Sequence, residues 1–95
     1  MDLTFSGEVF YWRGPSPWHF VAMPDRASAE IAAIASAVTY GWGVIPVTAR
    51  IGETSWETSL FPKDGLYVVP VKTRVRWAEQ FDLGDVVTVS LEIAT

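Results

Sequence analysis

The chain has 95 residues, of which 49% are hydrophobic and 19% charged, and its net charge at pH 7 is −4. A chain of this size fits a single domain with one core, because about 100 residues bury only roughly 60–70% of their unfolded surface. The absence of cysteine excludes disulfides and thiolate metal sites, and the acidic balance argues against nucleic acid as a partner.

No targeting or membrane segment is expected. The first ten residues lack a basic region followed by an apolar one, as a secretory signal would have. The longest apolar run, at residues 31–35, is far shorter than the ~18 residues of a membrane span. These features predict a cytoplasmic protein.

Two strands are predicted in the first quarter of the chain. Residues 3–12 alternate apolar and polar side chains, which is the period of a half-buried strand. Residues 13–17 contain a glycine and two prolines and are expected to form a loop. Residues 18–23 form the second predicted strand, and Pro24 ends it.

A helix is predicted over residues 26–37. Asp25 is a candidate N-cap, and Ile31, Ile34 and Ala35 follow at helical spacing. Residues 40–43, Tyr-Gly-Trp-Gly, interrupt this periodicity and predict a loop with aromatic side chains.

Three strands are predicted next, over residues 44–51, 54–61 and 66–71, and short turns between them predict a meander. Asp64 and Gly65 supply the second turn. Pro46 and Pro70 fall within strands, and since proline cannot donate to a ladder, each is expected at an edge or a bulge.

The last quarter predicts a short helix and a final strand. The helix runs from Thr73, its candidate N-cap, to Gln80, and the strand covers residues 86–93. Six strands and two short helices predict a mainly β protein, built as a small, mostly antiparallel, partly open barrel over residues 1–95, with a helix plugging one opening.

One pattern of residues runs through nearly the whole chain. It comprises Val44 to Val47, Trp56, Thr58 to Leu60, Pro62, Asp64-Gly65, Pro70 to Lys72, Arg76, Gly84-Asp85 and Val87. This pattern resembles the bacterial DUF1905 family. The resemblance implies a small six-stranded barrel without an assigned function, sometimes fused to or neighbouring a YdeI/OmpD-associated (bacteriocin-protection) domain. The chain departs from the family pattern at Thr73, Arg74 and Trp77 and in the loop at residues 40–43.

A shorter similarity covers only the last third. Pro70, Val75-Arg76 and Leu83 to Asp85 are similar to a run in swapped-hairpin transcription factors of the AbrB type. Those proteins bind DNA as intertwined dimers with a basic face, whereas acidic residues outnumber basic ones here by 11 to 7. An AbrB-like nucleic-acid-binding or anion-binding regulatory domain is therefore the alternative to a binding or interaction module of unknown ligand.

Catalysis is not expected. His19 is the only histidine, and nothing in the spacing of the serines and carboxylates suggests a partner for it. The glycines form neither a Walker run nor a dinucleotide-binding motif. The sequence therefore predicts no enzyme, no metal and no cofactor.

One candidate site stands out, at Lys72, Arg74 and Arg76. These residues place three of the seven basic side chains within five positions at the start of the second predicted helix, where backbone amides also favour an anion. Trp56 or Trp77 would offer an aromatic wall. The competing interpretation is structural: Arg76 pairs with Asp85, and Lys72 and Arg74 are solvated.

Five tryptophans also suggest an interaction surface. Trp18 and Trp56 are expected in the core, whereas at least one of Trp12, Trp42 and Trp77 is expected to be partly exposed. An imperfectly closed barrel with exposed aromatics favours a homodimer. The sequence thus leaves two kinds of partner open, a protein, including a second copy, and a small anionic ligand.

Overall fold

The computed structural model describes residues 1–13, 18–38 and 44–94. The described elements are β1 (Asp2–Trp12), β2 (Trp18–Ala22), α1 (Asp25–Val38), β3 (Ile45–Ile51), β4 (Thr54–Lys63), β5 (Leu66–Val71), α2 (Thr73–Glu79) and β6 (Val86–Glu92). The six strands and two short helices agree with the sequence-based prediction. The predicted loop at residues 40–43 lies outside the described residues.

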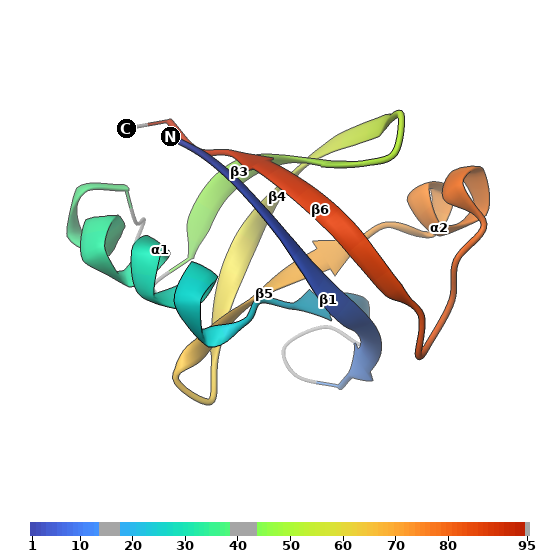
Figure 1. The fold of residues 1–95 in the computed structure, drawn as a ribbon, viewed down its shortest axis with the longest axis horizontal. Helices are drawn as coiled ribbons and strands as arrows, with labels where there is room; N and C mark the ends of the chain where they lie inside the picture. The colour runs from blue at the N-terminus through green and yellow to red at the C-terminus, as the bar shows by residue number, and fades with distance from the viewer. Residues whose placement is uncertain (14–17, 39–43, 95) are drawn as a thin grey trace.

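The strands form a closed barrel in the order β1-β2-β5-β4-β3-β6, with every pair antiparallel (Figure 1). The predicted meander of β3, β4 and β5 is confirmed. The prediction of a partly open barrel is wrong, because β6 pairs with β1 on one side and with β3 on the other. The closing ladder between β3 and β6 is short and covers only residues 48–50 and 90–92.

Pro46 and Pro70 lie where a strand has a partner on one side only. Pro46 is opposite Ser59 of β4, but it lies beyond the short ladder to β6. Pro70 is opposite Phe20 of β2, but it lies beyond the β4–β5 ladder, which joins residues 61–63 to 66–68. Each proline therefore sits at a local edge of the barrel, as predicted, where its missing N–H leaves no gap in a ladder.

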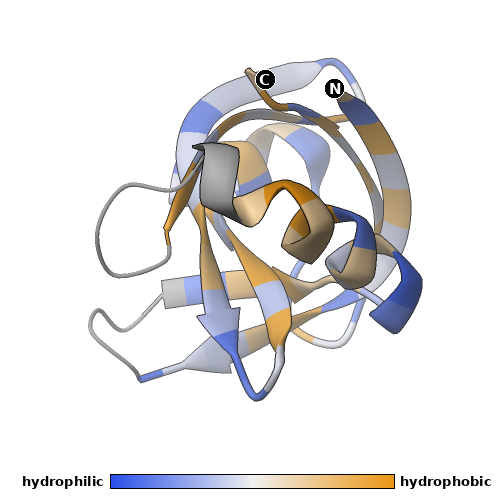
Figure 2. Ribbon diagram, turned by 90° about the vertical axis from the view of Figure 1, so that its left-hand side faces the viewer, coloured by the Kyte–Doolittle hydropathy of each residue, from blue (hydrophilic) through white to orange (hydrophobic). Residues whose placement is uncertain are grey.

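The two helices cover different sides of the barrel. Figure 1 shows α1 and α2 on opposite sides, and Figure 2 shows α1 lying across the end of the barrel. Ala27 and Ile31 of α1 are buried in the core, which confirms that a helix plugs one opening. At the other side, Val75 of α2 and the following Phe81 are also buried against that core.

Both helix starts differ from the prediction by one residue. The Ser28 N–H donates to the Pro24 carbonyl, so Asp25 is the first residue of α1 rather than its N-cap. Lys72, not Thr73, is the N-cap of α2, and no side chain caps that end. In the described residues, no helix has the length and apolar character needed to cross a membrane.

Candidate anion-binding site

Helix α2 is fixed against the edge of β4 by polar contacts. Thr54 Oγ1 donates to Glu79 Oε2 at 2.6 Å, and Arg74 Nη2 donates to the Ser55 carbonyl at 3.3 Å. This part of β4 is not paired with β5, so α2 takes the place of a neighbouring strand there. Arg74 is therefore engaged in holding α2 on the barrel.

Arg76 projects from α2 into a nearly buried position. Its side chain is only 14% exposed, and Nη1 donates to Asp82 Oδ1 at 3.1 Å. The Nε atom is buried and has no hydrogen-bond partner among the described residues. A guanidinium has five N–H donors, and a buried donor left unpaired costs about 1–3 kcal/mol. Arg76 is thus a cation with capacity for a further acceptor.

His19 reaches the same place from the barrel wall. Strand β2 lies between β1 and β5, and His19 stands opposite Tyr11 of β1 and Val71 of β5. The Tyr11 ring meets the imidazole edge-on at a centroid distance of 5.5 Å. His19 Nε2 lies 3.8 Å from Asp82 Oδ1, so the imidazole, Arg76 and Asp82 form one cluster.

The cluster shifts the pKa of two of its members. Burial, followed by the nearby Arg76 charge, lowers the pKa of His19, and Asp82 opposes this shift. The Leu83 N–H and the Arg76 side chain hold the pKa of the Asp82 carboxyl below its usual value. Neutral His19 and ionised Asp82 are therefore the expected forms at pH 7.

We expect acidification to weaken folding through His19 first. Because the folded state binds a proton at His19 less readily than the unfolded state, stability should fall as the pH drops below 6.5. The contribution of Asp82 is complete above its usual pKa of 3.8 and is lost only at more acid pH. Urea midpoints measured between pH 7.5 and 5 would check this.

His19→Gln is the matched variant for this measurement, because glutamine keeps a hydrogen-bonding side chain but does not titrate. It should flatten the part of the curve between pH 7 and 5. An unchanged curve in this variant would show that another group causes the pH dependence.

The predicted site residues are only partly brought together. The N–H groups of Val75 and Arg76 donate to the Lys72 carbonyl, so these two amides are not available to an anion. Trp56 is 2% exposed and lies in the core, as predicted, rather than forming an aromatic wall of the site. Trp77, in contrast, is 75% exposed on α2. Of the predicted site residues, Arg76 is the one that lies in the cluster with His19 and Asp82.

The predicted partner of Arg76 is wrong. Asp82 takes the place expected for Asp85, because the Asp85 carboxylate accepts a hydrogen bond from the Asp82 N–H at 2.9 Å. Sequence reasoning also missed His19 as part of the site. No local signal could have found it, since the pairing of β2 with β1 and β5 sets its position.

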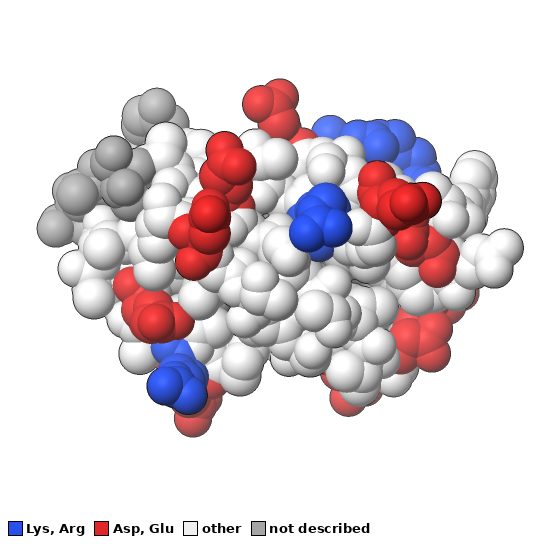
Figure 3. Space-filling view, turned by 45° about the horizontal axis from the view of Figure 1, so that its top comes forward, with Lys and Arg blue, Asp and Glu red and all other residues white. Residues whose placement is uncertain are grey.

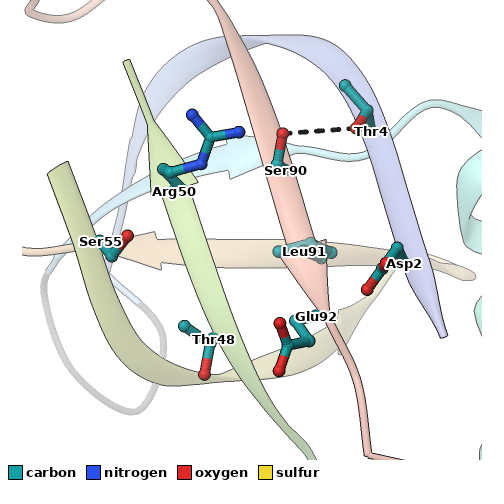
Figure 4. A pocket seen from close by; sticks show the side chains of 8 residues that line it. All are labelled: Asp2, Thr4, Thr48, Arg50, Ser55, Ser90, Leu91 and Glu92. Atoms are coloured by element: carbon teal, nitrogen blue, oxygen red, sulfur yellow. Dashed lines mark hydrogen bonds between the residues drawn. The ribbon is translucent and has the colours of Figure 1, made fainter. Parts of the chain in front are cut away.

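Other surfaces of the barrel offer weaker candidates. A groove of about 350 Å³ lies on the outer face of β1, β6, β3 and β4, and Figure 4 shows the side chains that line it. Several of the polar groups that line the groove already have partners. Thr4 and Ser90 share a hydrogen bond of 3.3 Å, and Arg50 donates to the Gly52 carbonyl. Figure 3 shows charged groups of both signs scattered over the face turned to the viewer, some of them side by side.

Comparison with known families agrees with the fold. The family described as "Domain of unknown function (DUF1905)" matches residues 5–91. The chain belongs to the DUF1905 family. No curated protein matches the chain.

The family match confirms the resemblance found in the sequence. It spans every residue of the cluster in this DUF1905 domain, Tyr11, His19, Arg76 and Asp82. The family has no assigned function, and neither the match nor the described residues support the AbrB-like alternative. The association with a bacteriocin-protection domain stays a prediction.

Proposed function

We propose that this DUF1905 domain is a non-enzymatic binding module that recognises a carboxylate or phosphate group through Arg76. The observation that supports the proposal is the buried Nε of Arg76, which has no acceptor among the described residues. The side chain is held from α2 on a rigid barrel, so its donors are preorganised. An acceptor could reach this buried atom only if the side chains around it moved, and it would then relieve the cost of the unpaired donor.

The chemistry of the cluster suits an oxyanion. A guanidinium can donate two parallel hydrogen bonds to a carboxylate or phosphate, which gives both strength and orientation. His19 lies next to the same carboxylate as Arg76 and can donate an N–H to an oxygen placed there. Lys72 and Arg74, on the same helix, add positive potential nearby.

Binding rather than catalysis is favoured by the partners of His19. Among the described residues, the side chains recorded next to His19 are Tyr11 and Asp82, and neither is a serine, threonine or cysteine of the kind that an adjacent imidazole activates. Four hydroxyl groups on the outer face pair with one another, Thr4 with Ser90 and Ser6 with Thr88. The proposal therefore includes no hydrolytic step.

Calorimetric titration with acetate, benzoate and inorganic phosphate tests the proposal. Arg76→Met should reduce the affinity for the anion that binds by about tenfold or more, because charge-assisted bonds are lost. Arg76→Lys should give an intermediate affinity, since it keeps the charge but not the planar fork.

Arg50→Met is the control, because it changes the net charge equally on the exposed outer face. An equal loss in this variant would mean that binding depends only on net charge. Failure of all three anions to bind the native domain would contradict the proposal.

Self-association stays a prediction. Three exposed apolar side chains, Trp77, Leu83 and Val86, lie on α2 or between it and the start of β6, and they support a homodimer through this region. The cytoplasmic location also stays a prediction.

A further inference from the structure

We infer that the Asp82 carboxylate occupies the position of the ligand's carboxylate, and that the ligand carries an apolar group next to its carboxylate, as in an aromatic acid or the C-terminus of a peptide. This inference rests on the proposed function. The ligand would be an acid with an apolar group, and Asp82 would compete with it for Arg76. The inference follows from the contacts of Asp82 and from the side chains around them.

Asp82 has the contacts of a bound carboxylate, although its side chain is 73% exposed. Its Oδ1 accepts from Arg76 Nη1 at 3.1 Å and from the Leu83 N–H at 2.8 Å, and His19 Nε2 lies 3.8 Å away. A backbone N–H, a guanidinium and an imidazole are the donors that proteins use to hold carboxylates. Because the Asp82 side of the pair is largely exposed, solvent weakens the interaction and a second carboxylate can displace Asp82.

The short loop after α2 can release Asp82 without unfolding. Its backbone is fixed independently of the Asp82 side chain, since the Asp82 N–H donates to Asp85 Oδ2 and the Asp85 N–H donates to the Asp82 carbonyl. The Gly84 N–H and the Asp85 carbonyl are bonded to Val9 of β1. Rotation of the Asp82 side chain therefore breaks two side-chain hydrogen bonds and leaves the loop attached to the barrel.

Two exposed apolar side chains belong to residues next to this cluster. Tyr11 is 47% exposed and rests edge-on against His19, and Leu83 is 53% exposed and directly follows Asp82. An apolar group attached to a carboxylate at Arg76 would cover these two side chains. Acetate and phosphate have no such group, so they should bind more weakly than benzoate or N-acetylphenylalanine.

Titration of Asp82→Asn with benzoate tests the competition. Asparagine keeps an oxygen for the Leu83 N–H and removes the charge that competes for Arg76, so affinity should rise about twofold to fivefold. Asp85→Asn is the matched control, because it removes one negative charge three residues away while its remaining side-chain oxygen can still accept the Asp82 N–H. Equal gains in the two variants, or no gain in Asp82→Asn while the native domain binds, would overturn the competition and leave the proposed function standing.

The ligand class is tested separately. Leu83→Ser should weaken benzoate binding several-fold and leave acetate binding unchanged, whereas Val86→Ser, at the more exposed apolar residue that begins β6, should alter neither. A peptide ending in phenylalanine with a free carboxylate, compared with its amide, distinguishes a chain terminus from a free acid. Equal affinities for acetate and benzoate would contradict the inference that the ligand carries an apolar group. If neither the native nor the Asp82→Asn protein binds these acids, both proposals are wrong.

Discussion

Trp56→Ala should lower the free energy of unfolding by about 3–5 kcal/mol, the range for truncating a buried tryptophan. Trp56 is 2% exposed, and its Nε1 donates to the Pro70 carbonyl at 3.0 Å. That bond crosses from β4 to β5 where the two strands are no longer paired. For a domain of this size the melting temperature should fall by about 4–8 °C per kcal/mol.

Trp56→Phe separates the hydrogen bond from the packing. Phenylalanine keeps most of the apolar volume but leaves the buried Pro70 carbonyl without its donor, at a cost of about 1–3 kcal/mol. Trp77→Phe, the same change at a 75% exposed position, should stay within about ±0.5 kcal/mol. Urea denaturation of the three variants gives the comparison, and equal stability of Trp56→Phe and native protein would show that the indole N–H is not needed.

Gly7→Ala should destabilise the domain by about 3 kcal/mol or more, the upper end of the cost of overpacking. A Cβ on Gly7 would clash with the backbone carbonyl oxygen of Ala22 and approach Val21 Cγ1 at 3.0 Å. Backbone atoms cannot give way as a flexible side chain can. The clash falls where β1 passes from its ladder with β6 to its ladder with β2.

Glu8→Ala is the control for Gly7→Ala, because its side chain is exposed on the next residue of the same strand. It should change the free energy of unfolding by no more than about 0.5 kcal/mol. If both variants unfold at the same urea concentration as the native domain, β2 can move away from β1 at little cost and the close approach is not a constraint.

Local patterns predicted the strands and helices well, because burial on one face fixes the period of the side chains. Residues 66–71 agree with β5 at both ends. Strand β4 continues two residues further than predicted, to Lys63, since Pro62 still stands opposite Tyr67 in the ladder. A proline at the edge of a sheet does not end its strand when the adjacent strand does not need a hydrogen bond from the proline nitrogen.

Closure of the barrel and the composition of the site could not be predicted in the same way. Closure depends on the register of β6 with β1, which joins residues about as far apart in the chain as possible, such as Asp2 and Glu92. The pairing of Arg76 with Asp82 depends on the geometry of the loop, in which Gly84 has a φ of +86° and Asp85 bonds the Asp82 N–H. Hydrophobic periodicity carries no information on either feature.

The most direct test of the account is a ¹⁵N-resolved NMR titration of the arginine side-chain Nε–H resonances with benzoate. We expect the Arg76 resonance, assigned by its absence in Arg76→Lys, to shift until binding is saturated and to exchange more slowly with solvent, while that of exposed Arg50 does not change. An Arg76 resonance that stays in place at every benzoate concentration, in both the native domain and Asp82→Asn, would contradict it.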